Sequence, residues 1–267
     1  AELRAVASDA IAEALSDEVA VLLLSQVDYR SGRRRDLAAT TAAAHRVGAI
    51  MLWDLSHSAG AIRIDLAASG AELAVGCGYK YLNGGPGAPA WLFVRRDLQD
   101  KLANPLPGWM GHARPFELAT DYAPAPGIRR FLTGTPPIVA LAALDAGVET
   151  FDGIDLTAVE TKSAALTAFF IEAVEALAPE ARLASPRDAR ERGAHLVFAH
   201  SNAYAIIQAL IARRVIGDYR EPDMMRFGFA PLTTRFEDAW RAAEALGEVI
   251  TSRAFDDPRF AERRRVT

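Results

Sequence analysis

Short apolar segments alternate with longer amphipathic segments along the first half of this sequence, and this alternation restricts the fold more than any other feature. A helix is expected over 35–47, and strands are expected over 19–25, 49–53, 73–77 and 89–94. Continuous apolar strands bounded by helices or tight loops are typical of a sheet covered on both faces, with parallel or mixed strands. The sequence therefore predicts an α/β architecture.

The pattern changes in the second half of the chain. Residues 103–134 contain five prolines and predict a long irregular loop, which in a compact domain is usually functional or part of an interface. Beyond it we expect helices over 136–151, 156–177, 203–213 and 236–250, and strands over 195–198, 215–219 and 224–229. We therefore divide the chain into part of a large α/β domain, residues 1–151, and a small C-terminal α+β domain, residues 152–267.

Composition excludes several classes of function. The net charge of -4 opposes binding to nucleic acid or to a membrane surface, because both need an excess of positive charge. A small-molecule ligand is the better expectation. The single cysteine, Cys77, forms no internal disulfide and favours a reducing compartment. With no run of 18 apolar residues and no signal peptide, we expect a soluble, cytoplasmic protein, and we expect no metal site.

The start of the chain carries apolar residues at helical spacing, at Leu3, Val6, Ile11, Ala14 and Leu15. It also lacks an initiating methionine. We therefore expect a helix at the start of this sequence, and we expect that the N-terminal part of a longer protein is missing from it.

Lysine is scarce, since only Lys80, Lys101 and Lys162 are lysines among 30 basic residues. Lys80 follows an expected strand, in an apolar and glycine-rich context. Asp54 ends the preceding strand, and His57 lies three residues beyond it. Taken singly, each has a structural interpretation: Lys80 as a surface lysine, Asp54 as a helix N-cap and His57 as a structural histidine.

Taken together, these three residues match the needs of pyridoxal phosphate (PLP). In open α/β sheets, ligands bind beyond the carboxyl ends of the strands, where all three residues are expected. A lysine forms a Schiff base with the PLP aldehyde, and a carboxylate keeps the pyridine nitrogen protonated so that the ring can accept electrons. This combination of residues therefore indicates a PLP-dependent enzyme.

Three motifs make the resemblance to a family specific: WDLSHSAG at 53–60, YKYLNGGPG at 79–87 and GWMGH at 108–112. With SQVDYRSG at 25–32 and RFGFAPL at 226–232, they resemble kynureninase over about residues 18–250. The resemblance implies PLP fold type I, with a mixed, mostly parallel sheet flanked by helices. In kynureninase-like proteins, a segment with further cofactor contacts precedes the region that this sequence resembles.

Carried over by position, the resemblance implies that Lys80 holds PLP and that Asp54 pairs with the pyridine nitrogen. His57 is expected against the ring and its phenolic oxygen. Tyr79 is expected to bind the phosphate and to supply a proton during the reaction. Ser25 is expected to contact the cofactor.

The resemblance also implies a homodimer with shared active sites, in which Trp109 and Thr135 reach the cofactor and substrate of the neighbouring subunit. Arg226 corresponds to the arginine that binds the substrate's α-carboxylate, for which a planar guanidinium fork is suited. Structural alternatives stay open for all three. In these alternatives, Trp109 only packs against a loop, Thr135 is the N-cap of the helix that follows, and Arg226 forms an ion pair with Asp223 or Glu221.

The function implied is hydrolysis of L-kynurenine to anthranilate and L-alanine, in tryptophan catabolism by the kynurenine pathway and in NAD biosynthesis. Thr135, where some relatives carry Asn, favours unsubstituted kynurenine over its 3-hydroxy form. A first alternative is another fold type I enzyme, such as a cysteine desulfurase or selenocysteine lyase-like protein. A small-molecule aminotransferase belongs to the same alternative. Desulfurases need a mobile nucleophilic cysteine, and the one candidate, Cys77, lies in an expected buried strand. A second alternative is a truncated remnant without catalytic activity.

Overall fold

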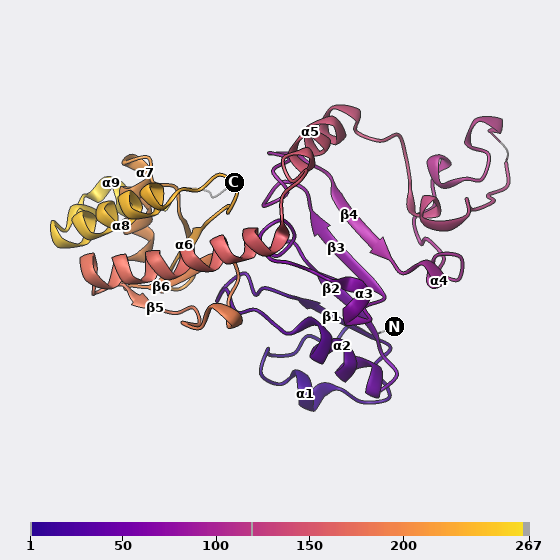
Figure 1. Cartoon of the computed structure of the whole chain (residues 1–267), viewed down its shortest axis with the longest axis horizontal. Coiled ribbons are helices and arrows are strands. Elements are labelled where there is room, and N and C mark those ends of the chain that lie inside the picture. The colour runs from indigo at the N-terminus through magenta and orange to yellow at the C-terminus, as the bar shows by residue number, and fades with distance from the viewer. Residues whose placement is uncertain (1, 119, 264–267) are drawn as a thin grey trace. The chain divides into compact units, whose positions relative to one another are not determined.

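The computed structural model describes residues 2–118 and 120–263. The chain divides into two compact units (Figure 1). The first comprises residues 1–24, 36–56 and 65–152, and the second comprises residues 25–35, 57–64 and 153–267. Because two short segments of the first half belong to the second unit, the domain boundary expected at residue 152 stays a prediction.

The sheet of the first unit has the order β1 (Val21–Ser25), β2 (Ile50–Asp54), β3 (Leu73–Cys77) and β4 (Ala90–Val94). Strands β2 and β3 are parallel, and β3 and β4 are antiparallel. Helix α2 (Leu37–Arg46) begins at Asp36, whose side chain accepts from the Ala39 amide. The fully buried Trp53 donates from its indole nitrogen to the Thr41 hydroxyl at 3.0 Å, which ties this helix to β2.

The remaining elements of the first unit are short, apart from one helix near its end. They are α1 (Ile11–Ala14), α3 (Leu66–Ser69), α4 (Arg96–Gln99), η1 (Trp109–Gly111), η2 (Pro115–Glu117), η3 (Gly127–Phe131) and α5 (Ile138–Glu149). The expected N-terminal helix is therefore wrong for most of its length. Leu3 is 95% exposed, and a short helix without apolar surface to cover is marginal in water.

The second unit is built on an antiparallel sheet with the order β5 (Arg182–Leu183), β6 (His195–Ala199), β8 (Met224–Gly228) and β7 (Asp218–Arg220). Its helices are α6 (Leu156–Leu177), η4 (Ala189–Glu191), α7 (Ala203–Ala212), α8 (Phe236–Thr251), η5 (Ala254–Asp256) and α9 (Pro258–Ala261). Asp155 starts α6 by accepting from the Thr157 amide at 2.8 Å.

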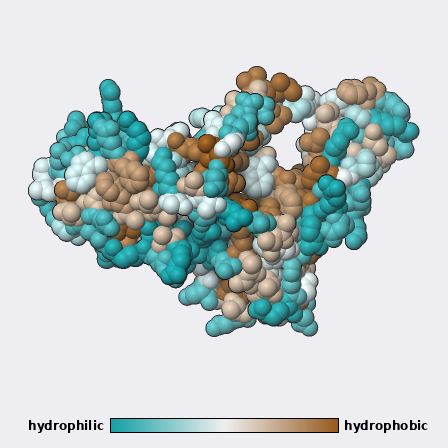
Figure 2. All heavy atoms as spheres, in the orientation of Figure 1, coloured by the Kyte–Doolittle hydropathy of each residue, from teal (hydrophilic) through white to brown (hydrophobic). Residues whose placement is uncertain are grey.

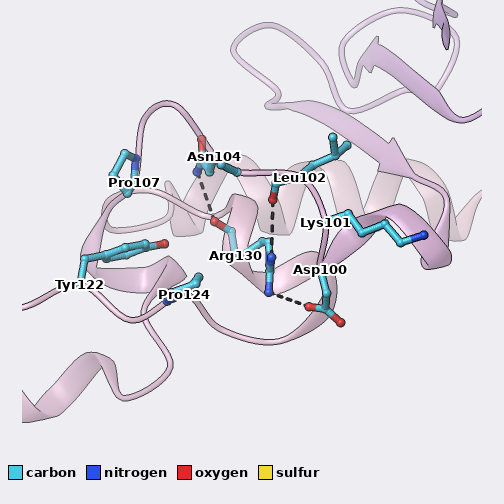
Figure 3. A pocket seen from close by; sticks show the side chains of 9 residues that line it. Asp100, Lys101, Leu102, Asn104, Pro107, Tyr122, Pro124 and Arg130 are labelled. Atoms are coloured by element: carbon cyan, nitrogen blue, oxygen red, sulfur yellow. Dashed lines mark hydrogen bonds and ion pairs between the residues drawn. The ribbon is translucent and has the colours of Figure 1, made fainter.

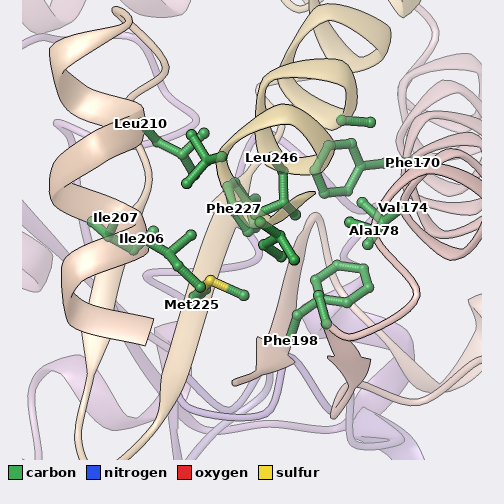
Figure 4. Close-up of a cluster of buried hydrophobic side chains, with 14 of the residues drawn as sticks. Phe170, Val174, Ala178, Phe198, Ile206, Ile207, Leu210, Met225, Phe227 and Leu246 are labelled. Atoms are coloured by element: carbon green, nitrogen blue, oxygen red, sulfur yellow. The ribbon is translucent and has the colours of Figure 1, made fainter. Parts of the chain in front are cut away.

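A large apolar cluster fills the second unit between its sheet and its helices (Figure 4). Within the cluster, the centre of the Phe170 ring of α6 lies 5.2 Å from that of the Phe227 ring and 5.9 Å from that of the Phe198 ring. Leu246 of α8 and Leu210 of α7 close the cluster from the helix side. Each fully buried side chain of this size contributes about 1.5–3 kcal/mol, so this core supports the sheet that carries Arg226.

Apolar side chains also remain at the surface of the first unit. Helix α5 exposes Ile138, Val139 and Leu141, and Figure 2 shows hydrophobic atoms on the surface at this helix. Val75 of β3 and Leu92 of β4 face each other in register and are both partly exposed. No helix in residues 2–118 and 120–263 is long and apolar enough to cross a membrane.

Candidate active site

Lys80 lies in a closed loop that connects the antiparallel strands β3 and β4. The Gly78 amide donates to the Pro89 carbonyl, and the Gly84 amide donates to the Gly78 carbonyl, each at 3.0 Å. Within this ring the Asn83 amide donates to the Lys80 carbonyl at 3.1 Å. These bonds fix the backbone on both sides of the lysine, so its side chain leaves the loop from a defined backbone position.

Two glycines of the loop, Gly78 and Gly84, have no room for a side chain. A Cβ at Gly84 would lie 2.9 Å from the Gly78 carbonyl oxygen, and a Cβ at Gly78 would lie 2.7 Å from the Pro89 carbonyl oxygen. Helix α5 presses on the same loop through Gly147, where a Cβ would lie 2.6 Å from the Leu82 carbonyl oxygen. Gly78, Gly84 and Gly147 therefore allow the backbone of the loop to pack closely on itself and on α5.

Asp54 is the last residue of β2 and lies beside the strand that leads to Lys80. Its register partner is Val75 of β3, and the Leu55 amide donates to the Val75 carbonyl at 2.8 Å. The Asp54 carboxylate accepts from the Ser56 amide at 2.9 Å, which turns the chain as it leaves the sheet. The carboxylate thus lies at the carboxyl end of a parallel strand pair, where open α/β sheets bind ligands.

Tyr79 and Lys80 follow the carboxyl end of β3. The Lys80 ammonium lies 5.3 Å from the centre of the Tyr79 ring, at cation–π distance. Tyr79 is 51% exposed, and Lys80 is half-buried. The first unit therefore brings an amine, a phenol and the Asp54 carboxylate to one edge of its sheet, and this donor set fits PLP.

Trp109 and Thr135 belong to the same unit, and both are exposed. Trp109 starts η1 and contacts the Phe116 ring edge-on, with 5.7 Å between ring centres. The alternative of Thr135 as a helix cap is wrong, because α5 starts after Pro137 and no side chain caps it. The first residue of α5 is Ile138, two residues later than that alternative required.

The irregular loop before α5 is held by Arg130. This side chain donates to Asp100 at 2.6 Å and to the Ala125 carbonyl at 3.2 Å, while the Arg130 carbonyl accepts from Asn104 at 3.2 Å. Figure 3 shows these groups around a cavity of about 350 Å³ that Tyr122 also lines. Arg130 therefore ties the start of this loop, at Asp100 and Asn104, to its end at Ala125.

Ser25, His57 and Arg226 belong to the second unit. The Arg226 guanidinium lies side-on against Asp218, with Nε 3.0 Å from Oδ1 and Nη2 2.6 Å from Oδ2. Its third nitrogen, Nη1, donates to the Tyr29 carbonyl at 2.8 Å. The expected alternative partners, Asp223 and Glu221, are wrong: the register of β7 and β8 sets Asp218 directly opposite Arg226.

The Tyr29 carbonyl belongs to a turn that is held by hydrogen bonds to Asp28. The Asp28 carboxylate accepts from the amides of Arg30 and Ser31, at 3.0 and 2.7 Å, and from the Ser31 hydroxyl at 2.8 Å. Burial alone would raise the pKa of Asp28, but these hydrogen bonds outweigh it and hold the pKa below its usual value. The turn is closed by Gly32, where φ is +72° and a Cβ would lie 2.7 Å from the His195 carbonyl oxygen.

His57 contacts a second histidine, with 5.3 Å between the centres of its ring and the His195 ring. His195 is 2% exposed, and neither ring nitrogen has a hydrogen-bond partner of regular geometry among the described residues. Burial, and then the positive charge of Arg226, lower the pKa of His195 to about 4. This imidazole is therefore neutral at physiological pH. Ser25 ends β1 and is partly buried.

Two of these residues, Asp218 and His195, were not among the candidates expected from sequence. A hairpin that turns at 221–223 brings position 218 opposite position 226, so the sequence held a usable signal for Asp218. His195 lies in a wholly apolar strand pattern and offered no such signal. The residues that the structure describes contain no group of three or more His, Cys, Asp or Glu arranged to hold a metal ion.

Comparison with known proteins gives a consistent result. The family model described as the kynureninase C-terminal domain matches residues 159–246. A kynureninase from Pseudomonas fluorescens is 46% identical over 257 residues, which is 96% of this chain and 62% of that protein. The chain spans less than two thirds of the length of the curated relatives it matches, 62% and 65% of them.

Solved structures show the fold. A cysteine desulfurase from Thermococcus onnurineus NA1 has a TM-score of 0.76 at 19% identity, over 90% of this chain and 62% of that chain. A mutant of C-DES with glycine covalently linked to its PLP cofactor has a TM-score of 0.75 at 19% identity, over 91% of this chain and 64% of that chain. The α/β fold expected from sequence, that of part of a PLP fold type I enzyme, is confirmed.

Proposed function

This chain is a homologue of the bacterial kynureninases, and from that premise we propose that it carries the lysine, the carboxylate and the substrate-binding arginine of an enzyme that hydrolyses L-kynurenine to anthranilate and L-alanine. The observation that supports the proposal most directly is the placement of Asp54 and Lys80 at one edge of the sheet in the first unit. There Asp54 ends one strand and Lys80 follows the adjacent parallel strand, and the backbone on either side of Lys80 is packed so closely that Gly78 and Gly84 have no room for a Cβ.

PLP, when bound, supplies an electron sink for the substrate's α-carbon. Lys80 would hold the cofactor through its side-chain amine, and, when released from that role, the Lys80 amine would accept the proton from the substrate's α-carbon. Asp54 keeps the pyridine nitrogen protonated. Tyr79 binds the phosphate and donates a proton to the alanine product; such acid–base assistance is worth about 10²–10⁴-fold in rate.

The other predicted residues fill supporting roles in this proposal. His57 lies against the ring, Ser25 contacts the cofactor, and Arg226 binds the substrate's α-carboxylate. Trp109 and Thr135 serve the neighbouring subunit of a homodimer, and their exposure in the first unit is compatible with that role. Placement in tryptophan catabolism, preference for unsubstituted kynurenine and a cytoplasmic location stay predictions.

The desulfurase alternative has less support. The likeness to desulfurase structures, at 19% identity, shows the fold alone. Cys77 is the last residue of β3, paired with Ala90 in the antiparallel register, and its thiol lies 3.7 Å from the Ser56 carbonyl oxygen. A cysteine fixed within a strand is poorly suited to carry sulfur between sites.

The proposal is tested by adding PLP to the full chain, recording the absorbance spectrum before and after borohydride reduction, and mapping the labelled peptide. We expect a visible absorbance band and labelling at Lys80. With three lysines in the chain, Lys101→Ala and Lys162→Ala are matched controls that leave the labelling unchanged, whereas Lys80→Ala removes it.

Hydrolysis of L-kynurenine is then assayed with the same variants. Lys80→Ala is expected to abolish turnover. Activity of Lys80→Ala within a few-fold of the parent would overturn the assignment. A parent chain that takes up no PLP would show that this chain alone is not the functional unit and would favour the alternative without catalytic activity.

A further inference from the structure

Arg226 makes more contacts than a substrate-binding arginine needs, and these contacts have a pattern. Asp218 occupies the edge of the guanidinium that is formed by Nε and Nη2, with contacts of 3.0 and 2.6 Å. The Tyr29 carbonyl accepts from Nη1 at 2.8 Å. The Arg226 side chain is 13% exposed, so these partners hold it in one orientation.

A count of donors shows what is left for a ligand. A guanidinium has five N–H groups, one on Nε and two on each terminal nitrogen. Asp218 takes the Nε proton and one Nη2 proton, and the Tyr29 carbonyl takes one Nη1 proton. One N–H on each terminal nitrogen remains, and an end-on carboxylate accepts from one N–H of each terminal nitrogen.

Asp218 is itself held in place. It lies opposite Arg226 in the register of β7 and β8, and it also accepts from Arg220 at 3.2 Å. The Tyr29 carbonyl is fixed by the turn that Asp28 and Gly32 close. Both partners of the guanidinium are therefore positioned by backbone structure, independently of any ligand.

We propose that Asp218 is a positioning residue: it fixes the Arg226 guanidinium side-on, so that the end of the fork faces the α-carboxylate of an amino-acid substrate. This inference rests on the proposed function, in which Arg226 binds that carboxylate. It adds a residue that contacts no substrate but sets the orientation, and hence the strength, of the carboxylate contact.

The geometry allows an opposite role, and the two differ in sign. If Asp218 instead competed with the substrate for Arg226, its removal would free the guanidinium and tighten binding. If it positions Arg226, its removal releases a flexible side chain whose ordering opposes binding. The direction of the affinity change therefore decides between them.

The test compares the full chain with Asp218→Ala, with the milder Asp218→Asn and with a matched control, Asp256→Ala. Asp256 holds Arg253 in the same side-on way, at 2.7 and 3.2 Å, elsewhere in the second unit. With PLP bound, Asp218→Ala is expected to raise KM for L-kynurenine about 10- to 100-fold while kcat changes little, since charged hydrogen bonds have this magnitude. Asp218→Asn is expected to fall between, and Asp256→Ala to match the parent.

A second readout does not depend on catalysis. In a ¹⁵N-labelled chain, the Arg226 Nε–H signal, assigned by its loss in Arg226→Lys, is expected to exchange slowly with water. It is expected to disappear in Asp218→Ala and to persist in Asp256→Ala. A parent without turnover, but with this pattern, would count against the proposed function and support the positioning role.

Two results would overturn the inference. One is an Arg226 Nε–H signal that persists in Asp218→Ala, which would mean that the guanidinium is held without Asp218. The other is an unchanged or lower KM in Asp218→Ala, with a folded chain by circular dichroism. If Asp218→Ala does not fold, an unchanged or lower KM in Asp218→Asn overturns it.

Discussion

At the scale of single residues, His195 makes the stability of the second unit depend on pH. Its pKa is lowered from 6.5 to about 4, by burial first and by the charge of Arg226 second. The unfolded chain therefore takes up a proton near pH 6.5 that the folded chain refuses until near pH 4. The free energy of unfolding is therefore unaffected by this group above pH 6.5, and it decreases as the pH falls from 6.5 toward 4.

A shift of this size corresponds to about 3 kcal/mol between pH 6.5 and 4. Urea unfolding at pH 7, 6, 5 and 4.5 measures this slope directly. His195→Leu replaces the titrating imidazole by an apolar side chain in the same buried strand and is expected to flatten the slope. An equal slope in parent and His195→Leu would show that other groups carry the acid sensitivity.

The sequence predicts the positions of the site residues better than it predicts their partners. The motif placed Lys80, Tyr79 and Asp54 at strand ends, and the structure puts them at one edge of the first unit. The same reasoning gave Arg226 the wrong salt-bridge partners, since nearness in sequence favoured Glu221 and Asp223. A strand register pairs residues by their distance from the turn, and this pairing selects Asp218.

At the scale of elements, the contact between α5 and the lysine loop yields a prediction in which two effects oppose each other. Gly147→Ala gains about 1 kcal/mol of helix propensity. The added Cβ, however, would lie 2.6 Å from the Leu82 carbonyl oxygen, and overpacking costs about 1–3 kcal/mol. We expect a net loss of stability, because a backbone carbonyl cannot move aside as a flexible side chain can.

Thermal and urea unfolding of Gly147→Ala measure this loss. Gly134→Ala is the control, since a Cβ there has no neighbour within 4 Å, and its stability is expected to change by less than about 0.5 kcal/mol. A stability of Gly147→Ala equal to or above the parent would contradict the close packing of α5 on this loop.

Strand β3 and helix α6 match the expected bounds at both ends. An apolar run between turns defines the strand, and the Asp155 cap defines the start of the helix. Strand β7 starts three residues later than expected, because Val215 packs against the core without joining the sheet. The helix expected at the N-terminus forms only over Ile11–Ala14, because its apolar residues have helical spacing but no apolar surface to pack against.

At the scale of the whole molecule, the apolar surface of α5 bears on the expected homodimer. Ile138 is 66% exposed and Val139 is 85% exposed, on a helix with few charges. Val139→Lys is expected to weaken self-association at least about 10-fold, because burying an unpaired charge is costly. Sedimentation velocity over a range of concentrations measures this, with Ile216→Lys, at a site 76% exposed in the second unit, as control. Equal effects of the two variants would argue against α5 as the contact.

The hairpin of β7 and β8 has a consequence for how such sites are recognised in other sequences. Asp218 and Arg226 face each other only because their separation along the chain matches the turn between them. One inserted or deleted residue in that turn would shift the register and send one of the two side chains to the opposite face of the sheet. A search for this kind of carboxylate anchor should therefore require the spacing of the pair and not merely the presence of its two residues.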